Sequence, residues 1–171
     1  MAIYAIKEYI KQKSYIHILE DSVISTKDMV DAEYFTRRCI EEFGENLVSI
    51  VLFGSRSRGI ATKRSDVDFI IVLDQNIEEE IVKNLRLDFI MKFGKKIDTI
   101  CLNRNDALDN FKRISPLFAT LVLGIKICYD KDGFFEKEFK KLTKRIRETR
   151  IKYYEGNKLW DIQKICTGIL H

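Results

Sequence analysis

The chain has 171 residues, with 30 lysines and arginines against 26 aspartates and glutamates, which leaves a net charge of +4. This length suits one compact domain, and 46% hydrophobic residues can build a core, so the composition excludes a wholly disordered chain. No apolar stretch reaches the roughly 18 to 20 residues of a transmembrane helix, and Lys7 and Glu8 come too early for a signal peptide. We therefore expect a single domain over residues 1–171, in the cytoplasm and without a membrane partner.

Histidine and cysteine offer little chemistry in this sequence. The two histidines, His17 and His171, have no partner at the spacing of metal ligands or of a catalytic triad. The cysteines lie far apart and never form a CxxC pair, which favours buried free thiols over disulfides or a zinc site. They are Cys39, Cys101, Cys128 and Cys166. Any catalysis must therefore come from carboxylates, hydroxyls, basic groups and bound ions.

The first half of the chain predicts two helices followed by two strands. Residues 2–12 fit a short helix, and Thr26 is a suitable N-cap for a second one, whose apolar residues recur at three- and four-residue intervals until Gly44. Leu47–Phe53 is apolar and rich in β-branched residues, and it leads directly into a glycine, so it predicts a buried strand before a special loop. A second strand is predicted over Asp66–Leu73.

The second half predicts alternating strands and helices. Apolar residues recur every four positions over Ile77–Phe93, which predicts a helix with Gly94 as its C-cap. A long helix begins near Phe135, its apolar side reaches Tyr153, and its last part, through Trp160, is predicted as a separate helix. Between these helices the predicted elements are a strand over Ile97–Leu102, a short helix around 105–111, a helix from Ser115-Pro116 to Gly124, a strand over 125–129 and a turn over 130–133.

The order of these elements indicates the fold class. Two strands close in sequence, followed by strands that helices separate, predict an α+β fold with a mixed β-sheet of about four strands and flanking helices. The core of this domain is expected over about residues 28–140, with an N-terminal and a C-terminal helical extension. No linker or internal repeat suggests a second folded domain.

The segment Leu52–Asp68 (LFGSRSRGIATKRSDVD) has the composition of an anion-binding loop. Gly54 and Gly59 permit tight turns and a close approach of the backbone to a ligand. Ser55 and Ser57 supply hydroxyl and backbone N–H groups that can donate to phosphate oxygens. Positive charge in the same loop comes from Arg56, Arg58, Lys63 and Arg64. An anion is therefore the expected ligand.

The common phosphate-loop motifs do not describe this loop. Gly54 and Gly59 have the GxxxxG spacing of a Walker A loop, but Ile60 and Ala61 stand where its lysine and its serine or threonine are required. The loop matches neither the dinucleotide fingerprint nor the glycine loop of kinases. Taken alone, it is equally well interpreted as a basic surface loop.

Nearby carboxylates favour the anion-binding interpretation. Asp66 and Asp68 stand two residues apart in a predicted strand, so their side chains project to the same face. Paired carboxylates repel each other unless a cation lies between them, and hard oxygen ligands suit Mg²⁺ together with substrate phosphates. Asp98 joins this cluster if its strand neighbours that of Asp66. Alternatively, Asp98 is a solvent-facing residue at the start of its strand, after Lys95 and Lys96.

Together these residues resemble the active-site signature of a known superfamily. Gly54-Ser55, ten intervening residues and Asp66-Val67-Asp68 form a GSx10DxD pattern. This pattern resembles that of the DNA polymerase beta-like nucleotidyltransferase superfamily, and the small prokaryotic members, called minimal nucleotidyltransferases, are the most similar type. The similarity covers about residues 28–140 and includes Asp98 in a later strand.

The resemblance implies a fold and a reaction. The fold is a mixed sheet with flanking helices, and the reaction moves a nucleoside monophosphate from a nucleoside triphosphate, in particular ATP, to a hydroxyl of a protein, an RNA or a small molecule, with release of pyrophosphate. Asp66 and Asp68 would hold Mg²⁺, with two ions expected, and Asp98 would complete the metal site or accept the proton of the incoming hydroxyl. These aspartates are the predicted catalytic and metal-binding residues.

The same resemblance assigns the loop to the nucleotide. Gly54 and Ser55 would bind the triphosphate through the turn that they form. Arg56 or Arg58 would stabilise the departing pyrophosphate, unless these arginines point to solvent. All four are therefore predicted nucleotide-binding residues.

The C-terminal part of the chain is strongly basic. From Lys137 to Lys152, basic residues exceed acidic ones by six charges. One interpretation is an RNA partner, with Tyr153, Tyr154 and Trp160 stacking on bases; the other is a solvated helix face with an aromatic core stripe. An alternative to catalysis thus stays open, an antitoxin-like or RNA-binding module that acts by binding alone. A protein toxin is a candidate partner in either case, and the oligomeric state is left open.

Overall fold

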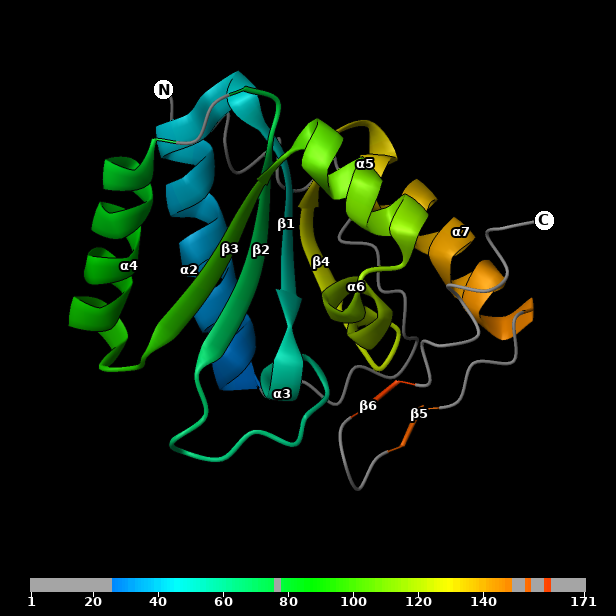
Figure 1. The fold of residues 1–171 in the computed structure, drawn as a ribbon. Helices are drawn as coiled ribbons and strands as arrows, with labels where there is room; N and C mark the ends of the chain where they lie inside the picture. Colours follow the sequence, from blue (N-terminus) through cyan, green and yellow to red (C-terminus); the bar gives the residue numbers. More distant parts are fainter. Residues whose placement is uncertain (1–25, 76–77, 149–152, 155–158, 161–171) are drawn as a thin grey trace.

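The computed structural model describes residues 26–75, 78–148, 153–154 and 159–160. A central β-sheet lies between two layers of helices (Figure 1). Its strands are β1 (Leu47–Phe53), β2 (Val67–Leu73), β3 (Ile97–Asn103) and β4 (Lys126–Asp130). The helices are α2 (Thr26–Phe43), α3 (Gly54–Ser57), α4 (Glu79–Phe93), α5 (Arg104–Arg113), α6 (Pro116–Leu121) and α7 (Phe134–Glu148), with short 3-10 turns η1 (Gly44–Asn46) and η2 (Lys131–Gly133).

The sheet is mixed, which confirms the predicted fold class. Its strand order is β3-β2-β1-β4, and β1 runs antiparallel to both of its neighbours. Strands β2 and β3 are parallel, and helix α4 makes the crossover between them. The C-terminal end of β1 therefore meets the N-terminal ends of β2 and β3 at one end of the sheet. There the register pairs Phe53 with Asp68, and Asp68 with Asp98.

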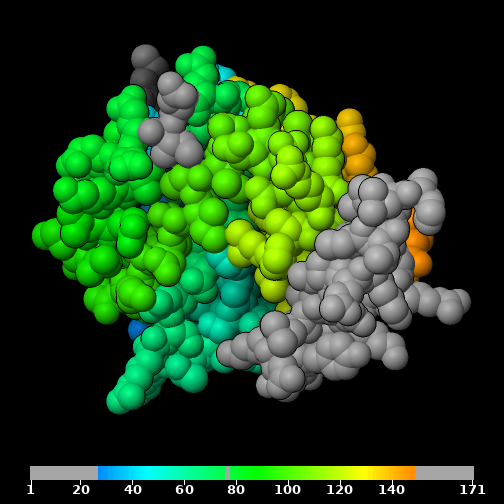
Figure 2. All heavy atoms as spheres, in the orientation of Figure 1, coloured from blue at the N-terminus to red at the C-terminus, as the bar shows by residue number. Residues whose placement is uncertain are grey.

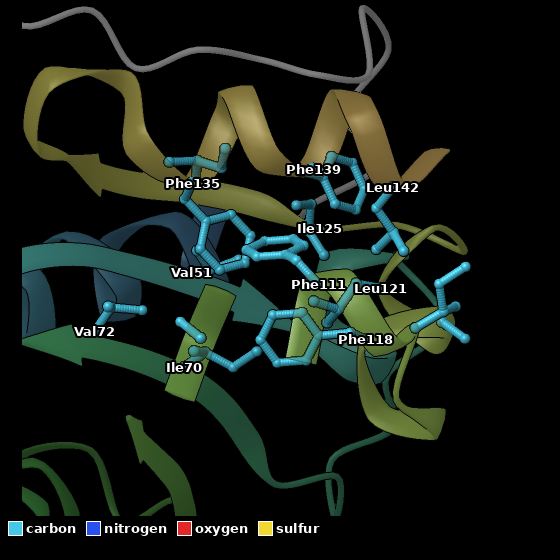
Figure 3. Packing of buried hydrophobic residues seen from close by; sticks show 14 of the residues in the cluster. Val51, Ile70, Val72, Phe111, Phe118, Leu121, Ile125, Phe135, Phe139 and Leu142 are labelled. Atoms are coloured by element: carbon cyan, nitrogen blue, oxygen red, sulfur yellow. The ribbon is translucent and has the colours of Figure 1, made fainter. Parts of the chain in front are cut away.

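Alternation along β2 divides the hydrophobic core into two parts. On one face, Phe69 packs against α2 and α4, where the ring of Phe35 stacks on it with centroids 4.6 Å apart. On the other face, Ile70 and Val72 pack beneath α5, α6 and α7 (Figure 3). Asp68 shares the alternation of Ile70 and Val72, so its side chain leaves β2 on the α5–α7 face.

The helix boundaries follow local signals in the sequence. The Ser115 hydroxyl accepts a hydrogen bond from a backbone N–H of the first turn of α6, which also holds Pro116, as predicted. Gly94 has a φ of +61° and ends α4, which confirms the predicted C-cap. The carboxylate of Asp130 accepts hydrogen bonds from two N–H groups at the start of α7. These local signals fix one end of each of the helices α4, α6 and α7.

The helices predicted through Tyr153 and Trp160 are wrong at both places. Tyr153–Tyr154 forms a short strand, β5, and Leu159–Trp160 forms β6, which pairs with it antiparallel. Aromatic residues favour extended backbone, and the intervening sequence contains Gly156-Asn157, which is unfavourable in a helix. The predicted helix over 2–12 lies outside the described residues.

The described cysteines are free thiols, as predicted, but Cys101 is only half-buried because it lies in the edge strand β3. Cys39, Cys101 and Cys128 are free thiols, while Cys166 and both histidines lie outside the described residues. Burial raises the pKa of Cys128 to about 11, so this thiol stays protonated near neutral pH. Among the described helices, none has the length and apolar character to cross a membrane.

Candidate active site

The candidate site begins where β1 ends, at Gly54. The backbone of Gly54 has a φ of +78°, a conformation that strongly favours glycine. A Cβ atom at this position would lie 2.3 Å from Oδ2 of Asp68, much closer than a real Cβ approaches another atom. Glycine is thus required twice, by the left-handed backbone and by the carboxylate that packs directly against it.

Hydrogen bonds hold the loop after Gly54 in place and leave the Ser55 hydroxyl available to donate to a ligand. Ser57 is buried, and its hydroxyl lies 2.8 Å from the carbonyl oxygen of Gly124 and 3.0 Å from that of Gly54. Arg58 Nε donates to the Gly54 carbonyl at 3.1 Å. The half-buried Ser55 hydroxyl makes no hydrogen bond to the rest of the described chain. Together with the first N–H groups of α3, which lack acceptors within the helix, it can donate to a ligand.

Three aspartates gather at the same end of the sheet, and we call Asp66, Asp68 and Asp98 the aspartate cluster. Asp68 in β2 lies beside Asp98 in β3, and Asp66 comes just before β2. The three do not converge on one point, because within the described residues no group of three acidic, histidine or cysteine side chains is arranged to hold a metal ion. The sheet brings their backbones close, while the side chains of Asp66 and Asp98 are 30% and 58% exposed.

The pKa of Asp68 is raised by the surroundings of its carboxyl group. Burial raises the pKa of its carboxyl above the ordinary value, and the negative charges of Asp66 and Asp98 raise it further. The positive charges of Arg56 and Lys96 oppose this rise without cancelling it. A negative charge on Asp68 is therefore unfavourable in the folded protein, and a bound cation would relieve it.

Basic side chains accompany the two outer aspartates. Lys96 Nζ lies 2.7 Å from Oδ2 of Asp66, and this hydrogen bond raises the pKa of Lys96. Arg86 Nη2 lies 3.9 Å from Oδ1 of Asp98, whose side chain is 58% exposed. Both sequence-based interpretations of Asp98 thus hold in part, because it is solvent-facing and yet stands beside Asp68.

The two arginines of the loop have different surroundings. Arg56 is buried, and its guanidinium donates to the backbone carbonyls of Ser65 and Asp66 and to the carboxylate of Asp28. Arg58 is only half-buried and contacts the loop at Gly54. Of these two predicted nucleotide ligands, the structure therefore leaves Arg58 nearer to solvent and turns Arg56 into the protein.

Behind the loop lies a group of charges that sequence reasoning missed. We call it the α2 cluster, and it consists of Asp28, Asp31, Lys95 and Arg56. Lys95 forms an ion pair with the buried Asp31 and lies 3.4 Å from Oδ1 of Asp28, which Arg56 also contacts at 2.6 Å. Two aspartates three residues apart on one helix face were the available signal.

The side of the molecule that carries the edge strand β3 is open. Figure 2 shows a hollow between α4 and β3 on one side and α5 and α6 on the other. A cavity of about 490 Å³ lies between α4 and β3, and Arg86, Thr99 and Cys101 are among its lining residues. Arg86 connects this cavity to the aspartate cluster, because it also reaches Asp98. Because Thr99 and Cys101 alternate with Asp98 along β3, the cavity lies on the α4 face of the sheet, and the exposed Asp98 side chain faces solvent at the edge strand.

Comparison with known proteins identifies the family. Residues 38–116, which contain the loop and all three aspartates, match the family model described as "Polymerase beta, Nucleotidyltransferase". A protein of Methanocaldococcus jannaschii, "Putative protein adenylyltransferase MJ1305", is 31% identical over 134 residues, which cover 75% of this chain and 89% of that protein. The chain belongs to the polymerase beta-like nucleotidyltransferase family, and it is an enzyme of this class.

Solved structures share the fold. A crystal structure of a toxin-antitoxin with AMP-PNP aligns with a TM-score of 0.50 and 16% identity, covering 81% of this chain and 98% of that one. A mutant of the toxin-antitoxin MntA-HpeT aligns with the same TM-score and coverage at 14% identity. At these identities the likeness supports the arrangement of sheet and helices and nothing further.

Proposed function

We propose that the protein transfers AMP from ATP to a hydroxyl group of another protein, in a reaction that needs a divalent metal and releases pyrophosphate. The observation that carries this proposal is the packing of Asp68 against Gly54, because it joins the aspartate cluster to the phosphate loop. The name of the M. jannaschii relative supports an adenylyl group as the group transferred and a protein as its acceptor.

The aspartate cluster fits a divalent metal such as Mg²⁺. Its members are hard oxygen ligands on neighbouring chain segments, and the pKa of Asp68 is raised by burial and by the other two carboxylates. A cation, the Lys96 ammonium, already accompanies Asp66. In this proposal Asp66, Asp68 and Asp98 would hold two such ions, whose binding requires the three carboxylates to move closer together. When bound, the metal supplies positive charge to the attacking and leaving oxygens of an in-line displacement.

The loop binds the triphosphate. Gly54 has no side chain, so phosphates can come close to the backbone, and the Ser55 hydroxyl and nearby N–H groups donate to their oxygens. Arg58, which contacts the same turn, neutralises negative charge on the departing pyrophosphate. Arg56 does not, because its guanidinium is buried and bonded to Asp28 and to the far end of the loop.

Asp98 is the residue that contacts the hydroxyl group of the acceptor protein. Its exposed carboxylate can be reached by a hydroxyl on a large partner, which a buried aspartate would exclude. The acceptor oxygen bonds to the α-phosphorus, the bond from this phosphorus to the oxygen that bridges to the β-phosphate breaks, and pyrophosphate leaves with that bond's electrons. The proton of the acceptor hydroxyl passes to the Asp98 carboxylate.

The RNA-binding alternative receives less support from the described part of the basic stretch. In α7 three lysines form ion pairs with carboxylates of the same helix: Lys140 with Glu136, Lys141 with Glu138 and Lys144 with Glu148. Such pairs are typical of a solvated helix face. A protein therefore remains the proposed acceptor, and the product of the gene beside this one, including any toxin, is the first to test.

The test has a binding part and a transfer part. Calorimetry with AMPCPP, an ATP analogue whose α–β bridge cannot be cleaved, is expected to give weak but measurable binding in EDTA, which Mg²⁺ or Mn²⁺ tightens strongly. Transfer is measured with ATP labelled at the α-phosphate and the product of the adjacent gene, and γ-labelled ATP is expected to leave no label. The double variant Asp66→Asn, Asp68→Asn is expected to lose both properties, whereas Asp109→Asn, an exposed carboxylate on α5, keeps them.

Two results would overturn the proposed function. One is AMPCPP binding that Mg²⁺ or Mn²⁺ does not tighten and that is unchanged in the double variant. The other is α-label that never reaches the supplied protein although that protein binds the enzyme. Partner binding that ignores both aspartates, combined with no transfer, would instead favour the non-catalytic module.

A further inference from the structure

Arg56 makes contacts that suit a structural clamp. It follows the Gly54-Ser55 turn, and only 5% of its surface is exposed. Its Nε donates to the carbonyl oxygen of Asp66 at 3.1 Å, and its Nη2 donates to that of Ser65 at 2.5 Å. One guanidinium therefore connects the start of the loop to its end.

The remaining bond of this guanidinium anchors the loop to a helix. Arg56 Nη1 donates to Oδ1 of Asp28 in α2 at 2.6 Å, and the Asp28 side chain is 12% exposed. Lys95, at the turn between α4 and β3, lies 3.4 Å from the same oxygen and pairs with Asp31. The positive charge of Arg56 is thus balanced inside the protein, and its planar fork is directed at the backbone of the loop.

We propose that Arg56 is a positioning residue that sets Asp66 relative to the Gly54-Ser55 turn, and that it does not bind phosphate. This inference rests on the proposed function, in which Asp66 holds the metal and the turn holds the triphosphate. Arg56 joins both, because its backbone belongs to α3 and its side chain grips the carbonyl of Asp66.

The physical consequence concerns geometry more than charge. A metal that contacts both Asp66 and the phosphates requires a fixed distance between them, and small misplacements reduce the rate strongly. Lysine at position 56 could keep the ion pair with Asp28, but a single ammonium cannot reproduce the fork that reaches both carbonyls. Arg56→Lys therefore separates positioning from charge.

The experiment compares four variants of the full chain: Arg56→Lys, Asp28→Asn, Arg38→Lys and Asp66→Asn. Mn²⁺ affinity in the presence of AMPCPP is measured by electron paramagnetic resonance, AMPCPP affinity in EDTA by calorimetry, and stability by thermal melting. Arg56→Lys is expected to weaken Mn²⁺ binding about tenfold and to lower kcat more than it raises KM, while AMPCPP affinity in EDTA stays unchanged. Asp28→Asn, which keeps the bonds of Arg56 to the loop, is expected to weaken Mn²⁺ binding less.

Arg38→Lys is the matched control for lost stability. Arg38 also holds several partners, namely Asp88, Glu41 and Glu42, but it lies toward the C-terminal end of α2 and its ion pairs are with α2 and α4, not with the loop. Its variant is expected to lower the melting temperature and to leave Mn²⁺ affinity and the kcat-to-KM split unchanged. This control shows whether the loss of an arginine's ion pairs, and the lower stability that follows, is enough to weaken Mn²⁺ binding.

The outcomes distinguish this inference from the proposed function. Mn²⁺ binding that Asp66→Asn abolishes but Arg56→Lys leaves intact would overturn the positioning role alone. Loss of AMPCPP affinity in EDTA on Arg56→Lys would also overturn it, because it would make Arg56 a phosphate ligand. Mn²⁺ binding indifferent to Asp66→Asn would overturn the proposed function, and the positioning role with it.

Discussion

The α2 cluster and the aspartate cluster meet at one loop and balance their charges in opposite ways. In the α2 cluster, Asp28 and Asp31 face two cations, Arg56 and Lys95. In the aspartate cluster, Asp68 makes no ion pair with any described residue, and its pKa is raised by burial and by its two acidic neighbours. The first arrangement stabilises the folded chain, whereas the second reduces its stability unless a ligand binds.

This difference separates structural from functional charge more clearly than residue type does. Both clusters contain buried or half-buried aspartates, and both adjoin the phosphate loop. A cluster whose charges are already balanced needs no bound ion, so removing one of its residues is expected to lower stability first. An excess of negative charge beside a phosphate loop favours binding of a cation. Removing one of these aspartates is therefore expected to abolish function while stability is kept or raised. Four substitutions test this contrast.

The largest expected effect on stability comes from breaking the α2 cluster at Asp31. Asp31→Ala leaves the Lys95 ammonium partly uncompensated in a buried place, and we expect the free energy of unfolding to fall by about 3 kcal/mol. Urea denaturation followed by circular dichroism measures this loss. Glu41→Ala, which removes an exposed partner of Arg38, is the control and is expected to cost less than about 1 kcal/mol. Equal losses in the two variants would contradict a structural role of the cluster.

Gly54→Ala tests the contact that joins the loop to the aspartate cluster. The new methyl group would collide with the Asp68 carboxylate, so we expect a loss of about 2 kcal/mol in stability and about a hundredfold loss in transfer. Gly94→Ala is the matched control, because Gly94 also has a positive φ but a Cβ there meets no atom within 4 Å. The control is expected to cost about 1 kcal/mol and to leave transfer unchanged. Equal activities of the two variants would contradict the role of this contact.

Asp68→Asn is expected to stabilise the metal-free protein. Because the folded-state pKa of Asp68 is raised, the unfolded chain loses this proton at lower pH than the folded chain does, and wild-type stability falls as pH rises through that interval. Asparagine has no such loss, so thermal melts in EDTA should agree at the acid end of this interval and differ by about 2 °C at pH 7. Asp66→Asn, which removes the partner of Lys96, should bring no gain. A lower melting temperature for Asp68→Asn at pH 7 would argue against excess charge in the cluster.

The smallest expected effect concerns Lys96. Its side chain is 68% exposed, so its pairing with Asp66 contributes little to stability, but its ammonium competes with a metal for that carboxylate. We expect Lys96→Met to tighten Mn²⁺ binding roughly two- to threefold in low salt, measured by paramagnetic resonance. Lys63→Met, an exposed lysine elsewhere in the loop, is expected to change nothing. Weaker Mn²⁺ binding in Lys96→Met would mean that Lys96 holds Asp66 in place.

Much of the fold could be predicted from the sequence because its two central strands, β1 and β2, are buried on both faces. The apolar run Leu47–Phe53 became β1 with the same bounds, and the period of Ile77–Phe93 became α4, which begins at Glu79 and ends at the predicted Phe93, while Ile77 lies outside the described residues. The strand pair β5–β6 was not predicted, because two-residue strands are too short to show a hydrophobic periodicity. The four-residue helix α3 was missed for the same reason.

The candidate site divides in a similar way. The spacing from Gly54 to Asp68 is local, and it indicated the loop, the carboxylates and the family from the sequence alone. The surroundings of Arg56 could not be predicted, because its partner Asp28 lies 28 positions away and the contact between Lys95 and Asp31 spans 64 positions. Such pairs depend on how α2 packs across the sheet.

The sequence by itself determined which groups could do chemistry, because a run of glycines, hydroxyls and paired aspartates at set intervals has few other uses. Only the tertiary structure decided what each charge faces. The parallel register of β2 and β3 put Asp98 beside Asp68, and the packing of α2 behind the loop drew Arg56 inward to Asp28. Both outcomes follow from one physical fact, that burying a charge is costly and each buried charge must find its partner in space, wherever that partner lies in the chain.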